Sequence, residues 1–332
     1  MAPVFAHTGI DYARVTHSGD DGPGSLRAAI LHANDDEETR IVFQIPVTDA
    51  GFDAKVGVWT LAPRSPLPPI RAKGTVLDGV SQTQILDSNP NGPEIRLSGK
   101  NLRRTPGANA PTGILVLAPN CALKNLSFAD FAGAALTIRG EESLDNRVEN
   151  CVFEGSAAPQ LLITGGANAN QIENNRFFLS GKTGETAIRV AGQGSTHNTL
   201  RLNRFFAANK PNGEFSARLR PIWLDSDEIQ KPILKITRLE KAGVFHEVSV
   251  EFRGAPGRKY TLDMLRANEE NFWASYAKIE TQTSEIQTDE TGRALWKSEV
   301  RGYPAGSFAA QITSRQGQSS EISDVWVMPY LR

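Results

Sequence analysis

The stretch NRVENCVF (146–153) returns as NQIENNRF (170–177) and again as NTLRLNRF (198–205). Each copy has asparagine first, an aliphatic residue third and phenylalanine last. An earlier copy, CALKNLSF (121–128), begins with cysteine but otherwise fits. The closing phenylalanines follow one another at intervals of 25, 24 and 28 residues; they are Phe128, Phe153, Phe177 and Phe205. A period of this length indicates a repeat architecture.

A second short apolar segment follows each phrase: ALTIRG (135–140), LLITGG (161–166) and AIRVAG (187–192). Apolar and polar residues alternate in these segments, which is typical of half-buried strands and not of helices. Short strands, glycine turns and a period in the mid-twenties favour one coil of a parallel β-solenoid. We therefore predict stacked coils from roughly 40 to 210, with the four phenylalanines stacked inside.

Three further columns follow from this alignment. We expect a column of asparagines at a bend, stacked so that their amides hydrogen-bond along the column: Asn125, Asn150 and Asn174. A charged column should face solvent, with opposite charges meeting at two of three boundaries: Lys124, Glu149, Glu173 and Arg201. The two cysteines, Cys121 and Cys151, lie five residues out of register, a span of about 16 Å. We predict that both are free, buried thiols.

The two ends of the chain predict different structures. Ser25 is a suitable N-cap for a helix near 25–34 whose apolar stripe is Leu26, Ala29, Ile30 and Ala33. We expect this helix to cap the solenoid, with less regular strands at 41–45, 58–62, 75–80, 94–99 and 113–118. Residues 233–328 contain about seven alternating segments without helix signals, which predicts a small β-sandwich. We place the domains at 1–225 and 226–332.

The composition excludes several classes of function. The chain has 332 residues and a formal charge of −1, which gives no electrostatic footprint for nucleic acid. No run of 18 apolar residues occurs, so we expect no membrane insertion. The start, MAPVFAHTGIDYARV, lacks the basic region and apolar run of a signal peptide. This predicts either a cytoplasmic protein or a mature form with an added Met.

Several segments resemble secreted right-handed parallel β-helix proteins of bacteria, which have a pectate-lyase-like solenoid. They are GDDGPGSLRAAILHAN (19–34), IVFQIP (41–46), LPPI (67–70), VLDGVSQ (76–82), EIRLSG (94–99) and the N-x-[VIL]-x-x-N phrases. Near the end, KYTLDMLRA (259–267), TDETGRALW (288–296) and SSEISDVW (319–326) resemble an Ig-like module that often follows such coils. The resemblance implies an all-β fold with a Gly-Ser-Leu-Arg-x-Ala capping helix, and an extracellular or cell-surface location.

Candidate catalytic residues come from adjacent coils. Asp130 and Glu154 lie one position apart in the alignment, which suits the paired carboxylates of a glycosidase. Asp145 and Arg147 flank a bend near Arg139, and a lyase needs a base and a cation. The alternative is that all of these residues are solvated.

Metal and sugar sites have only local signals. An acidic run, Asp225, Asp227 and Glu228, offers oxygen ligands for Ca²⁺, although an ordinary linker has the same composition. The five histidines, at 7, 17, 32, 197 and 246, are scattered, and none has a metal-ligand spacing. Four tryptophans either stack on sugars or fill a core: Trp223, Trp273, Trp296 and Trp326. We expect no other cofactor.

These observations leave three hypotheses. The leading one is a non-catalytic extracellular or cell-surface protein whose rigid β-helix serves adhesion or a larger surface assembly, with surface proteins as partners. The second is a carbohydrate-active enzyme, a polysaccharide lyase or glycoside hydrolase. The third is a carbohydrate-binding protein without turnover. A groove with clustered arginine, lysine and carboxylates would favour the second, and a row of exposed aromatic residues along one face would favour the third.

Overall fold

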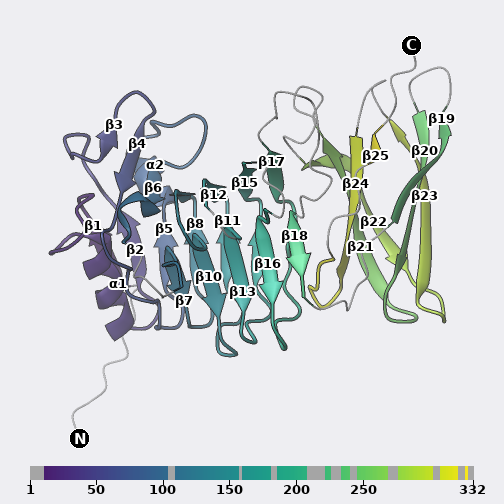
Figure 1. Ribbon diagram of the computed structural model, residues 1–332, viewed down its shortest axis with the longest axis horizontal. Helices are drawn as coiled ribbons and strands as arrows, with labels where there is room; N and C mark the ends of the chain where they lie inside the picture. The colour runs from purple at the N-terminus through teal and green to yellow at the C-terminus, as the bar shows by residue number, and fades with distance from the viewer. Residues whose placement is uncertain are drawn as a thin grey trace, which may run out of the picture.

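The computed structural model describes residues 11–103, 109–156, 159–180, 185–207, 221–225, 233–239, 245–267, 276–301, 307–320 and 326–327. The described chain is predominantly β, with few helices (Figure 1). Parallel sheets occupy the first two thirds of the chain, which we call the parallel region (12–225). Antiparallel sheets follow in the antiparallel region (233–327). No described helix is long and apolar enough to span a bilayer.

Each turn of the chain in the parallel region adds strands to three sheets. The first sheet contains, in spatial order, β1 (Tyr12–Val15), β2 (Arg40–Phe43), β5 (Val76–Asp78), β8 (Ala122–Lys124), β11 (Arg147–Glu149) and β14 (Gln171–Glu173). The second contains β18 (Ile222–Leu224), β16 (Ile188–Ala191), β13 (Leu161–Thr164), β10 (Leu136–Arg139) and β7 (Ile114–Val116).

The third sheet is the one that carries the candidate site. It contains β17 (Arg204–Ala207), β15 (Arg176–Leu179), β12 (Val152–Glu154), β9 (Ser127–Ala129), β6 (Ile95–Ser98), β4 (Val58–Leu61) and β3 (Phe52–Asp53). Only the β3–β4 pair is antiparallel. Successive turns lie side by side along the long axis of the molecule (Figure 1). This arrangement is compatible with a parallel β-helix.

The predicted aromatic column is confirmed. Phe128, Phe153, Phe177 and Phe205 pair in register between adjacent strands. Their ring centroids lie 4.9, 4.7 and 5.4 Å apart with nearly parallel planes. All four rings are buried in a core that runs the length of the parallel region. The repeat therefore exists because each turn must present the same apolar shape to the next one.

The asparagine prediction is right about the bends and wrong about the hydrogen bonds. Asn125, Asn150 and Asn174 adopt left-handed backbone with φ of 50°, 56° and 58°, which asparagine tolerates. The buried amide ladders run instead through other asparagines: Asn146–Asn170–Asn198 and Asn175–Asn203, with Nδ2 to Oδ1 distances of 2.9–3.0 Å. The first ladder ends at the Cys121 amide, which donates to Asn146 Oδ1 at 2.8 Å.

Helix α1 (Leu26–Asp35) covers the first end of the core as predicted. The Ser25 hydroxyl accepts a hydrogen bond from the Ala28 amide at 3.1 Å, and the predicted stripe of Leu26, Ala29, Ile30 and Ala33 is buried. The strand predicted at 75–80 is wrong after Asp78, because Val80–Ile85 forms the short helix α2. The structure also has the 3₁₀ turn η1 (Gly99–Asn101) and the strand β1, neither of which was predicted.

The described residues of the antiparallel region include all seven predicted strands, arranged in two sheets. The first contains β19 (Ile233–Leu239), β20 (Phe245–Arg253) and β23 (Arg293–Arg301). The second contains β22 (Tyr276–Gln287), β21 (Lys259–Ala267), β24 (Ser307–Ser314) and β25 (Trp326–Val327). Buried residues from both sheets, among them Phe252 and Leu262, belong to one core.

The two regions touch at the open end of the first parallel sheet. The Ser319 amide donates to the Asn198 carbonyl at 3.1 Å, and the Leu200 amide donates to Ser319 Oγ at 2.9 Å. Arg201 forms a two-bonded ion pair with Asp263 of β21, at 2.7 and 2.9 Å. Arg201 therefore does not simply face solvent. In the same column, the predicted Lys124–Glu149 pair is present at 2.8 Å.

Candidate functional site

A groove of about 380 Å³ crosses the outer face of the third sheet, a size typical of ligand sites. Its floor comes from the outward-facing residues of β6, β9, β12 and β15, and its walls come from the loops at 54–58 and 88–93. Side chains alternate across a strand, so residues next to the buried Phe128, Phe153 and Phe177 face outward, and five of them line the groove: Ser127, Val152, Glu154, Arg176 and Phe178. The register that stacks the buried phenylalanines therefore also aligns the outward-facing residues of the groove floor.

The two wall loops support each other. Ser88 Oγ donates to the Gly57 carbonyl at 2.7 Å, and a Cβ on Gly57, whose φ is +69°, would meet the Ser88 carbonyl oxygen at 2.0 Å. Only glycine fits this contact and this backbone conformation. The Asn89 side chain donates to the Pro93 carbonyl and accepts from the Asn91 amide. The walls are therefore fixed by hydrogen bonds within and between the loops.

A row of arginines runs along the sheet. The strand register places Arg96, Ser127, Val152, Arg176 and Arg204 in one line. Arg176 Nη2 donates to the Asn91 carbonyl at 2.6 Å. Burial, and then the charge of Arg204 on the next strand, lower the pKa of Arg176. Like charges opposite each other on adjacent strands repel, so this end of the row favours an anion.

Arg96 forms an ion pair with Glu154, a carboxylate on the groove floor. Its Nη2 lies 3.1 Å from Glu154 Oε1. Its Nε is shielded from solvent and has no acceptor among the described residues. A buried donor without a partner costs about 1–3 kcal/mol.

Aromatic rings lie beside the arginines. Phe178, 37% exposed, stacks on Phe206 with centroids 4.5 Å apart and planes 10° from parallel. Both follow a core phenylalanine, in the shared sequence NRFF (175–178 and 203–206). Strand β15 therefore places positive charge and an apolar ring in the groove, and β17 continues both beyond it.

The two groups of predicted catalytic residues lie at different sheets. Glu154 lies in the groove, whereas Asp130 follows β9 at a bend with a φ of 60° and accepts from Ser98 Oγ at 3.3 Å. Asp145 and Arg147 belong to the first sheet, where both are exposed. The Asp130 amide donates to the Glu154 carbonyl at 3.3 Å, so these two residues are neighbours on adjacent turns, whereas the segment with Asp145 and Arg147 lies at another sheet.

The predicted calcium ligands are described only in part. Asp225 pairs with Arg189 at 3.1 Å, and the Arg189 guanidinium lies 5.2 Å from the Trp223 ring centroid. Asp227 and Glu228 lie outside the described residues. Among the other tryptophans, Trp296 packs against the core of the antiparallel region. The side chains of Trp273 and Trp326 are outside the description.

Sequence reasoning missed Arg96, Arg176, Arg204 and Phe178. A signal was present, because NRFF occurs twice and places an arginine and a phenylalanine on either side of a core ring. The walls had no such signal, because their residues lie more than 70 positions from Arg176 in sequence. No protein-family model matches this chain, and no curated protein matches it either.

Proposed function

We propose that the protein binds an acidic polysaccharide along the outer face of the third sheet without cleaving it. The observation that carries the proposal is the line of Arg96, Arg176 and Arg204 beside the stacked Phe178 and Phe206. Guanidinium groups bind carboxylates with two parallel hydrogen bonds. Exposed phenyl rings provide apolar surface for the faces of sugar rings.

The spacing favours an extended ligand over a small anion. Arg96 and Arg176 are three strands apart, a distance of about 14 Å at the usual strand separation. Arg204 follows one strand further, beyond the groove itself. A linear polyanion lying across the strands meets all three charges in succession. A single carboxylate or phosphate would meet one end only.

A glycan-binding role also fits a particular fold and a particular location for the protein. We infer a right-handed, pectate-lyase-like β-helix, followed by an Ig-like sandwich that acts as spacer or second module. Such a protein would work outside the cell or at its surface. There it would hold a glycan or take part in a larger surface assembly through adhesion.

Turnover is the second candidate function, because Glu154 lies beside Arg96 in the groove. A lyase or glycosidase would use this carboxylate as a base or as half of a pair. We favour binding because Glu154 is held by Arg96 and the predicted partner, Asp130, is bonded to Ser98.

Gel retardation tests the proposal with polygalacturonate and alginate as acidic polymers and dextran as the neutral one, each with and without Ca²⁺. The variant is Arg204→Glu, and the matched control is Arg147→Glu, an exposed arginine on the first sheet. We expect retention by an acidic polymer only, roughly tenfold weaker in the first variant and unchanged in the control.

Ultraviolet absorbance of unsaturated sugars and a reducing-end assay are followed in the same samples. Product formation would replace the binding proposal with the enzymatic one. Equal binding by both variants, or equal retention by dextran, would reject the groove as the acidic-glycan site.

A further inference from the structure

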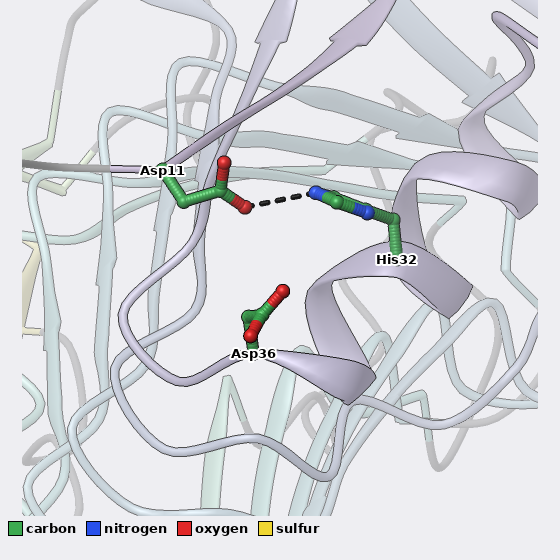
Figure 2. Close-up of side chains that lie close together, drawn as sticks. All are labelled: Asp11, His32 and Asp36. Carbon is green, nitrogen blue, oxygen red and sulfur yellow. Dashed lines mark hydrogen bonds and ion pairs between the residues drawn. The ribbon is translucent and has the colours of Figure 1, made fainter. Parts of the chain in front are cut away.

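A group of potential metal ligands lies at the opposite end of the parallel region from the antiparallel sheets. Asp11, immediately before β1, and His32 and Asp36, in and after the last turn of α1, each offer one ligand atom. These three atoms lie within 4.8 Å of one another. Figure 2 shows the three side chains directed toward one shared space.

Separate parts of the fold produce this arrangement. His32 lies in the last turn of α1, and Asp36 is the extended residue that follows the helix, so the end of α1 brings these two side chains together. Asp11 directly precedes β1, which pairs with β2. The Arg40 amide at the start of β2 donates to the Asp11 carbonyl at 2.8 Å. The search for metal-ligand spacings in the sequence missed this group, because strand pairing and not local spacing brings Asp11 to the helix.

Neighbouring groups orient the carboxylate. The buried Thr39 hydroxyl lies 3.3 Å from Asp11 Oδ2 and 3.1 Å from the Asp36 carbonyl oxygen. His32 Nε2 is 2.8 Å from the same Asp11 Oδ2. Metal-binding carboxylates typically have such supporting partners. Two carboxylate oxygens and one imidazole nitrogen are a ligand set of zinc, which takes a water or another ligand at the fourth position.

We propose that Asp11, His32 and Asp36 bind a zinc-class divalent metal ion. The ion replaces the direct His32–Asp11 bond and links the first strand to the capping helix. A site with one imidazole ligand prefers zinc-class ions to calcium or magnesium, which favour oxygen ligands only. Because the metal binds the folded chain, it stabilises the end of the core that α1 covers.

Calorimetric titration of the tag-free full-length chain, after removal of metals with a chelator, tests this site. Zn²⁺ and Co²⁺ are the probes, and the visible absorption of Co²⁺ reports the coordination. We expect one ion per chain and a higher Tm with Zn²⁺. His32→Ala should weaken Zn²⁺ binding by roughly 100-fold, and Asp36→Asn should weaken it to a lesser degree.

His197→Asn is the matched control, because His197 has a φ of 57° that asparagine tolerates. His32 is half exposed, so its replacement should leave the Tm in chelator nearly unchanged and separate loss of metal from loss of fold. Equal Zn²⁺ affinity in wild type and His32→Ala would overturn the proposal. Binding of Ca²⁺ as tight as Zn²⁺, or no binding of Zn²⁺, would overturn it as well.

Discussion

Burial determines the chemistry of the two cysteines. Cys121 and Cys151 are free, and neither is accessible to solvent. Burial raises the pKa of Cys121 to about 11 and that of Cys151 to about 12. Both thiols therefore stay protonated in the folded chain at neutral pH and act as small apolar core residues.

These pKa values predict a loss of stability at alkaline pH. In the unfolded chain the thiols ionise near pH 8.5–9, whereas the folded chain keeps both protons until about pH 11–12. Above pH 9 the unfolded state binds fewer protons, so the free energy of unfolding falls as pH rises. At pH 10 each thiol lowers it by about 1–2 kcal/mol relative to pH 8.

Urea unfolding at pH 8 and pH 10 measures this loss, and a Cys121→Ala/Cys151→Ala variant is the control. The variant should have a lower free energy of unfolding at pH 8. That free energy should fall less between pH 8 and pH 10 than it does in the wild type, because only tyrosine and lysine titration remains. An equal loss in both proteins would show that the native thiols ionise normally.

Individual residues of the core were the most predictable part of the chain. A buried position that must match its copy on the next turn leaves a visible mark, as Phe153 and Phe177 do. Asn174 shows the limit of this reasoning. Its column was predicted from repetition, but repetition alone does not distinguish a left-handed bend from an amide ladder, since asparagine suits both.

Elements were predictable where local signals sufficed. The Ser25 cap and the apolar stripe define α1 from sequence alone. Helix α2 has no such signal, because tertiary contacts stabilise it. Its buried Gln82 accepts from the Ile45 amide at 2.9 Å and donates to the Ile45 carbonyl at 3.1 Å. Strand β1 was missed because it has only four residues and its partner, β2, begins 28 residues further along the chain.

The amide ladder links successive turns, and we expect Asn170→Ala to weaken it strongly. Asn170 is buried, accepts from the Asn146 amide and side chain, each at 3.0 Å, and donates to Asn198 at 2.9 Å. Alanine leaves the Asn146 amide and side chain buried without this acceptor and removes the side-chain bond to Asn198, which should lower the free energy of unfolding by about 3 kcal/mol. Urea unfolding at neutral pH is the measurement.

Asn174→Gly is the matched control for the ladder. Asn174 is exposed with a φ of 58°, which glycine adopts without strain, so the change should stay within about 1 kcal/mol. Similar losses in the two variants would mean that the ladder contributes no more than an ordinary turn asparagine.

Over the whole molecule, the site depends on parts that are distant in sequence. Arg176 contacts the loop at 88–93, and neither segment indicates the other. Pairing between distant segments depends on how many residues each turn contains, and insertions between repeats change that number. The sequence therefore predicted the stacked turns and the buried column beneath the groove, but not the arginines on its floor or the loops that form its walls.

The ends of the parallel region require cover, because exposed strand edges promote aggregation. Helix α1 covers one end, and the antiparallel region meets the other through Ser319 and the Arg201–Asp263 pair. Asp263 is 1% exposed at its side chain and Arg201 is 23% exposed. Arg201 gives the buried Asp263 carboxylate two charge-assisted hydrogen bonds, and breaking a buried ion pair by removing one partner is strongly destabilising.

We therefore expect Arg201→Ala to loosen the contact between the two regions. It should lower the free energy of unfolding by about 3 kcal/mol and split the calorimetric unfolding into two separated transitions. Arg315→Ala is the control, since the Arg315–Glu285 pair is exposed at both partners and surface pairs of this kind contribute little to stability. If Arg201→Ala and Arg315→Ala unfold alike in one transition, the ion pair does not couple the regions. Their contact would then depend on the backbone bonds of Ser319.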